Sequence, residues 1–316
     1  MIRNFTLSNR YFSESALLLV TLLWGGTFTI VKISLLDISP MLFIALRFSV
    51  ATLILLPVIL INRSVFDSGS VKAGLILGII IFLAFAAQTI GLKFTTATKS
   101  GFITGSLVVM VPIFQIIIER KKPTKSAIWG VIIVFIGILF LSSGGNSIIN
   151  FLSNLGANFN IGDFLTLICA ALFAVHVVYL DSFSPKYDFL VLLFLQIAVA
   201  AVLGFISSFL FSVNSLDTIK IEYSSYLLFG ILYTAVFASL ITTALQTKYQ
   251  KNVSPTKAGI IYSFEPIFAA IIAFFVLNEK ITNLGFIGCM LIFIGLVISE
   301  VYDSYFCKNG KKKSQS

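Results

Sequence analysis

Long runs of apolar residues, separated by short polar segments, fill most of the chain. Each run is roughly 20 residues long, which is the length of helix that crosses about 30 Å of hydrocarbon. A run such as Ile76 to Ala87 shows no alternation of polar and apolar residues, so it is not the strand of a lipid-spanning barrel. The pattern therefore predicts an all-α integral membrane protein with ten transmembrane helices. Their predicted ranges are 15–35, 40–61, 72–92, 98–118, 126–142, 162–181, 188–212, 224–247, 255–277 and 283–301.

Composition supports lipid as the solvent of this chain. The residues are 58% hydrophobic and 11% charged, whereas soluble domains carry about 25% charged residues. The formal charge of +9 comes from Lys and Arg in short clusters between apolar runs, which argues against a nucleic-acid surface. The three cysteines are odd in number, and two of them lie within apolar runs. We therefore expect no disulfide framework and no metal site.

The distribution of basic residues orients the helices. With a cytoplasmic N-terminus, 16 of the 22 Lys and Arg fall in inside segments, five fall outside, and Arg47 alone lies within a span. Such an excess of positive charge marks the cytoplasmic side. Trp24 and Lys32 stand where a signal peptide would have a small-residue cleavage site, so the first run is predicted to be a retained helix. We expect a multi-pass protein of the inner membrane, with both termini and a basic tail, 302–316, in the cytoplasm.

The two halves of the chain repeat each other. Thr98–Ile103 at the start of the fourth span is echoed by Thr256–Ile261 at the start of the ninth, and Gln88 and Gln246 precede the shared Lys by the same 11 residues. The sequence Pro-Ile-Phe then follows in both halves, and an acidic residue before a basic one follows it. These matches predict a first repeat, 15–142, an external linker, 143–161, and a second repeat, 162–301. Because each repeat has an odd number of spans, the second inserts upside down relative to the first.

Several short motifs, in order, resemble those of the EamA-like transporters of the drug/metabolite transporter superfamily. They are Leu-Trp-Gly-Gly-Thr-Phe at 23–28, Arg-Phe at 47–48, the stretch 98–112, Ser-Pro-Thr-Lys-Ala-Gly at 254–259, Glu-Pro-Ile-Phe at 265–268 and Asn-Glu-Lys at 278–280. The resemblance covers both halves. It implies two bundles of five helices around a central cavity, no covalent cofactor, and transport of metabolites such as amino acids, often outward.

We expect a solute cavity near the midplane, walled by the first, third, fourth, sixth, eighth and ninth spans. The candidate cavity residues are Trp24, Thr27, Gln88, His176, Tyr179, Gln246 and Tyr262. The two repeat-related glutamines suit ligand binding or hydrogen bonds between helices. His176 is the only histidine, and it suits either a proton relay or a hydrogen-bonded packing role. Tyr179, three residues on, shares its helix face.

Two charged residues lie deep within predicted spans. Arg47 is open to three interpretations: a structural or gating contact with backbone carbonyls, direct binding of an anion, or snorkelling to the interface. Glu265 is followed at once by Pro266, whose missing N–H frees a carbonyl and invites a kink. A carboxyl at this depth is costly to keep ionised, so it suits proton coupling, binding of an ammonium group, or a hydrogen bond between helices. The predicted hinge or kink positions are Gly25, Gly26, Pro112 and Pro266.

These features predict a secondary-active exporter of amino acids, related metabolites or drugs, working by alternating access, with a coupled proton as a further candidate partner. The chain has no Gly-rich phosphate loop followed by Lys and Ser or Thr, which argues against ATP drive. A sugar, nucleoside or nucleotide-sugar carrier of the same superfamily is the alternative. A channel or scramblase and a membrane-embedded enzyme are the alternatives from other classes; a lone histidine and scattered acids do not favour an enzyme.

Overall fold

The described part of the chain is a bundle of helices. The computed structural model describes residues 7–62, 66–142, 147–157, 159–277 and 282–313, and within them the only β structure is an isolated bridge between Ile38 and Ile221. The α-helices are α1 (Leu7–Gly25), α2 (Thr27–Ser34), α3 (Pro40–Ile61), α4 (Ser68–Phe94), α5 (Ala97–Gly105), α6 (Leu107–Glu119), α7 (Lys125–Ser142), α8 (Ile148–Ala157), α9 (Ile161–Phe183), α10 (Phe189–Val213), α11 (Ser225–Ala235), α12 (Thr242–Tyr249), α13 (Pro255–Tyr262), α14 (Glu265–Leu277) and α15 (Asn283–Lys313). A π-helical turn, η1 (Val236–Ile241), joins α11 to α12, and a 3₁₀ turn, η2 (Gln250–Asn252), follows α12.

Seven helical stretches of the described chain are long and apolar enough to cross a membrane. They are Tyr11–Ser34, Pro40–Ile61, Ser68–Phe94, Lys99–Glu119, Ile161–Phe183, Phe189–Val213 and Ser225–Asn252, and shorter apolar helices cover Lys125–Phe140 and Asn283–Ser299. The prediction of an all-helical membrane protein is confirmed. The remaining predicted span, 255–277, contains two shorter helices, α13 and α14.

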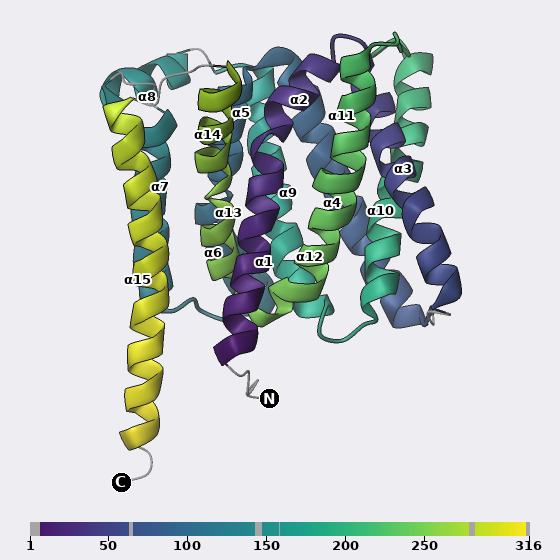
Figure 1. The fold of residues 1–316 in the computed structure, drawn as a ribbon. Coiled ribbons are helices and arrows are strands. Elements are labelled where there is room, and N and C mark those ends of the chain that lie inside the picture. Colours follow the sequence, from purple (N-terminus) through teal and green to yellow (C-terminus); the bar gives the residue numbers. More distant parts are fainter. Residues whose placement is uncertain (1–6, 63–65, 143–146, 158, 278–281, 314–316) are drawn as a thin grey trace.

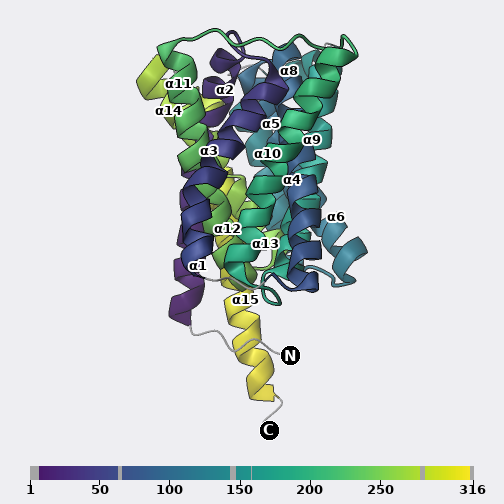
Figure 2. The ribbon, with the colours of Figure 1, turned by 90° about the vertical axis from the view of Figure 1, so that its right-hand side faces the viewer.

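The helices stand side by side in one bundle, as Figures 1 and 2 show from two directions. The start of α1 and the end of α15 lie at the same end of the bundle, and α8 lies at the opposite end (Figure 1). Helix α8 falls inside the predicted external linker, 143–161. It is 10 residues long and too short to span a bilayer, so a pattern of apolar runs about 20 residues long does not indicate it.

Three of these long stretches, and the predicted span 255–277, are interrupted near their middle. Helix α1 gives way to α2 at Gly26, α5 to α6 at Ser106, and α13 to α14 at Ser263 and Phe264, while η1 interrupts the stretch from α11 to α12. The break before α14 lies directly before Pro266, as the missing N–H of proline predicts. In the first half α6 continues through Pro112, and the break lies about a turn and a half earlier, at Ser106.

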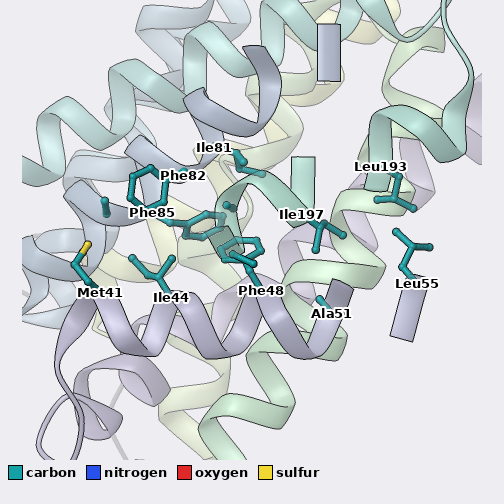
Figure 3. Close-up of a cluster of buried hydrophobic side chains, with 13 residues drawn as sticks. Met41, Ile44, Phe48, Ala51, Leu55, Ile81, Phe82, Phe85, Leu193 and Ile197 are labelled. Carbon is teal, nitrogen blue, oxygen red and sulfur yellow. The ribbon is translucent and has the colours of Figure 1, made fainter. Parts of the chain in front are cut away.

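A cluster of buried apolar side chains ties α3 to α4 and α10. Figure 3 shows its labelled members pointing toward one another from these helices: Met41, Ile44, Phe48, Ala51, Leu55, Ile81, Phe82, Phe85, Leu193 and Ile197. Since α3 and α4 belong to the first predicted repeat and α10 to the second, this cluster packs residues of both halves together. Phe85, at the edge of this cluster, also reaches the pocket described below.

Helix α1 touches α14 at Gly25, and this contact gives a first prediction. A Cβ atom at Gly25 would lie 2.8 Å from Cβ of Phe268 and 3.0 Å from the backbone N of Ala269. We expect Gly25→Ala to cost about 1–3 kcal/mol through overpacking, seen as a lower thermal unfolding midpoint in detergent. Gly26→Ala is the matched control, because its new Cβ meets nothing closer than 3.8 Å. Equal midpoints for the two variants would contradict the close α1–α14 packing.

Candidate functional site

A pocket lies where the interrupted helices meet. About 440 Å³ of space between atoms lies there, a value that includes its open mouth. Its lining residues come from the first, third, fourth, sixth, eighth and ninth predicted spans. They are Trp24, Thr27, Phe85, Gln88, Thr104, Leu107, Phe173, Val177, Gln246, Tyr262 and Glu265.

Aromatic rings form a large part of the wall. The ring centroid of Trp24 lies 5.6 Å from that of Tyr262 and 6.5 Å from that of Phe173. Phe173 in turn meets Phe85 edge-on at 5.1 Å. The indole N–H of Trp24 donates to the carbonyl oxygen of Ala238 in η1 at 3.3 Å, so the π-helical turn helps to position this ring. Such a wall suits an apolar or amphipathic solute and can also attract a cation through its ring faces.

Glu265 brings the one acidic side chain of this lining into the pocket. Among the residues that the structure describes, no side chain forms an ion pair or a hydrogen bond with the carboxyl group of Glu265. The buried hydroxyl of Thr104, also in the wall, interacts with the thiol of Cys169. An unpaired carboxyl away from water is costly, so this group needs a proton, a solute or water to complete it.

The amide and hydroxyl groups of the wall differ in whether they already have a hydrogen-bond partner within the protein. The Tyr262 hydroxyl donates to Oε1 of Gln250 at 2.9 Å, and Gln250 Nε2 donates to the carbonyl of Val177 at 2.6 Å, so these groups hold α9 and α13 together. The Thr27 hydroxyl donates to the carbonyl of Trp24 at 2.8 Å. Gln88, by contrast, makes no side-chain hydrogen bond within the described part of the chain. Its amide therefore remains available to a solute in the same pocket as Glu265.

Two predicted cavity residues lie outside the pocket lining. His176 is buried, and its Nε2 lies 2.8 Å from Oε1 of Gln196, whose own amide donates to Thr247 at 3.2 Å. Tyr179 stacks on Phe183 with ring centroids 5.5 Å apart. On α9 the pocket is reached instead by Phe173 and Val177, four residues apart on one helix face. His176 therefore holds a packing position in this structure.

Arg47 does not line the pocket, but it contacts Phe85, which does. It is 2% exposed, and its Nε and Nη2 donate to the hydroxyl of Ser239 in η1 at 3.1 and 2.9 Å. Its guanidinium carbon lies 4.5 Å from the ring centroid of Phe85 and 5.0 Å from that of Phe48. The interior position excludes snorkelling in this structure, and the contacts connect α3 to the π-helical turn and to a ring of the pocket wall.

Five lining residues were missed from the sequence: Phe85, Thr104, Leu107, Phe173 and Val177. Phe173 could have been found by aligning the two halves of the chain with a different shift in residue number. A shift of 149 residues aligns Trp24 with Phe173 and Arg47 with Gln196, and the two rings of the first pair face each other in the pocket. Thr104, Leu107 and Val177 have no comparable signal, because apolar and small residues occupy most positions of these helices.

Comparison with known proteins decides the family. A family model described as the EamA-like transporter family matches residues 12–143 and, a second time, residues 160–300. The chain belongs to the EamA-like transporter family. Its membership explains the motif order along both halves, and it makes the protein a transporter of the drug/metabolite type.

Relatives of this EamA-like chain have similar lengths. An uncharacterized transporter of Archaeoglobus fulgidus is 33% identical over 92% of this chain and 86% of its own length. A second one from that organism is 27% identical over 90% of this chain and 95% of its own length, and the uncharacterized transporter YoaV of Bacillus subtilis is 22% identical over 89% and 94%. A crystal structure described simply as that of a protein matches with a TM-score of 0.73 over 94% of this chain and 99% of its own, at 15% identity. That last likeness concerns the fold alone.

Proposed function

We propose that this EamA-like protein is a secondary carrier of the inner membrane that exports small organic solutes by alternating access. In this proposal ten helices form two inverted repeats, 15–142 and 162–301, with both termini in the cytoplasm. The double match of the family model supports the division into repeats. The shared end of α1 and α15 supports an even number of crossings. The breaks between α5 and α6 and between α13 and α14, which are equivalent in the two repeats, support a central site at discontinuous helices.

The observation that carries the proposal is the unpaired carboxyl of Glu265 in a pocket walled by aromatic rings. A carboxylate with ring faces around it is the chemistry that binds an ammonium group. No Lys or Arg belongs to the described lining, and Arg47 is turned away to Ser239. This favours amino acids and related amines over phosphorylated solutes such as nucleotide sugars, which need basic side chains.

The experiment that tests the function begins without a known substrate. Metabolites in the medium of overexpressing cells are compared with those of deleted cells, and each enriched amine is then tested with purified protein in proteoliposomes. Counterflow that saturates with substrate concentration supports a carrier. Flux that rises linearly without counterflow contradicts it and indicates a channel or scramblase.

The proposed orientation gives a second prediction. We expect a cysteine placed at Asn154, within α8, to react with a membrane-impermeant thiol reagent in intact cells, because the segment 143–161 has no Lys or Arg and is predicted to be external. A cysteine at Lys122, in a basic segment, should react only after the membrane is opened. The protein without an added cysteine is the control for its native thiols. Reaction of both positions in intact cells, or the reversed pattern, would contradict the orientation.

A further inference from the structure

An ion pair with a buried acidic partner joins the two halves of the molecule. Nζ of Lys99 in α5 lies 2.8 Å from Oδ2 of Asp163 in the first turn of α9, whose side chain is fully buried. Asp163 also accepts hydrogen bonds from the Thr95 hydroxyl and the backbone N–H of Asn160. Close backbone packing surrounds it, since a Cβ atom at Gly162 would lie 2.5 Å from the carbonyl oxygen of Gly91. Helices α4 and α9 therefore pack tightly next to this pair.

A second ion pair joins the halves in the other direction. Nζ of Lys257 in α13 lies 3.6 Å from Oε1 of Glu14 in α1, and the two side chains are 4% and 18% exposed. Here the lysine belongs to the second repeat and the acid to the first, whereas in the Lys99–Asp163 pair the lysine belongs to the first repeat and the acid to the second. At 3.6 Å against 2.8 Å, this is the longer of the two contacts.

The two pairs are equivalent under the repeat. Lys99 and Lys257 are each the third residue of a half-helix, α5 and α13. Glu14 precedes Trp24 by 10 residues, and Asp163 precedes Phe173 by the same 10 residues. Because a helix rises 1.5 Å per residue, each acid lies about 15 Å, or half a bilayer, from the pocket ring on its own helix. The two rings face each other across the pocket.

The pairs therefore lie at opposite ends of the pocket. Helix α5 stands at the end of the bundle that carries α8, whereas α1 begins at the other end and α13 lies below α14 (Figure 1). Glu14 is near the start of α1, and Asp163 is near the start of α9. A motion that opens one end by moving α5 away from α9, or α1 away from α13, separates the pair at that end.

We propose that Lys99–Asp163 and Lys257–Glu14 are the two gates of the pocket, one for each side of the membrane, and that they open in alternation. This rests on the carrier function proposed above. Both ion pairs are formed in this structure, and the pair at the α8 end has the shorter distance. Breaking either pair removes an interaction of the closed end alone, so it shifts the population toward the conformation open at that end.

The test measures access to the pocket from each side without any substrate. Cys169, Cys289 and Cys307 are replaced by Ala, and a single cysteine is placed at Leu107 in the pocket wall. A membrane-impermeant maleimide is applied to right-side-out and to inside-out vesicles. We expect Lys99→Gln to speed labelling from the α8 side on the order of tenfold and to slow it from the other side, with Lys257→Gln doing the opposite.

Matched controls separate gating from loss of fold. Glu222→Gln removes an exposed pair with Lys220 at 3.3 Å, within one loop, and should leave both labelling rates unchanged. Opposite shifts for the two Gln variants support the gates, provided that size-exclusion profiles match. Shifts of the same sign, or no shift, overturn them. Because no transport is measured, this result stands apart from the outcome of the counterflow experiment.

Discussion

Glu265→Gln is expected to abolish uphill transport while leaving the fold intact. The amide keeps the size of the carboxyl group and removes its charge change. Since no described side chain pairs with this carboxyl group, its loss breaks no internal ion pair, and purified protein should show an unchanged unfolding midpoint. The effect should therefore appear in the transport cycle, where the carboxyl group must bind either a proton or a cationic group of the solute.

Two measurements on one preparation of proteoliposomes distinguish these roles. If Glu265 carries a coupled proton, Glu265→Gln should still catalyse counterflow but lose accumulation driven by a pH gradient. If Glu265 binds an ammonium group, counterflow itself should weaken, with an apparent affinity lower by roughly 10- to 100-fold, the usual value of a charge-assisted contact of about 1.5–3 kcal/mol.

Glu222→Gln is the matched control for this substitution, because Glu222 lies on an exposed loop with a 68% exposed side chain. It should leave counterflow and uphill accumulation at the original level. Original levels of both activities in Glu265→Gln would show that the carboxyl group has a structural role only, and the coupling hypothesis would then fall on His176 or be abandoned.

Arg47→Leu is expected to reduce transport on the order of tenfold, and more than Arg47→Lys does. Arg47 makes two charge-assisted hydrogen bonds to Ser239 and lies against the ring of Phe85. Leu relieves the cost of a buried charge, so abundance should fall less than activity. What it loses is the connection between α3, the π-helical turn and a ring of the pocket wall. Lys keeps the charge but offers no planar fork of donors.

A double-mutant cycle with Ser239→Ala measures this connection. If the hydrogen bonds carry the effect, Ser239→Ala should reproduce much of the Arg47→Leu loss, and the double variant should be little worse than either single one. Transport rates are compared at equal amounts of protein in proteoliposomes. Original activity and abundance in Arg47→Leu would contradict any role for the guanidinium group.

Much of the architecture is readable in the sequence, since lipid imposes simple rules. Runs of about 20 apolar residues must be helices, because every backbone polar group in a bilayer must be satisfied within its own segment. The break before α14 follows from Pro266, which has no N–H to donate. Trp24, Thr27, Gln88, Gln246 and Tyr262 are predicted to line one cavity, and the structure brings them to one pocket, together with Glu265.

Tertiary packing, in contrast, decides which face of each helix turns to the protein interior and which turns to lipid. In a soluble protein an apolar stripe shows which face is buried, but here lipid and protein interior are both apolar, so the helices carry no such stripe. The sequence therefore could not tell that α9 turns Phe173 and Val177 to the pocket and His176 to Gln196.

The sequence also could not predict which polar side chains pair with each other across the bundle. Composition, helix positions, repeat and family membership follow from the chain alone, because they depend on residue type and order. The pairing of Arg47 with Ser239, 192 residues away, and of Lys99 with Asp163, 64 residues away, depends on how the two halves dock. Buried polar groups take whichever partner that docking brings within hydrogen-bond distance, because leaving them unpaired in lipid is costly.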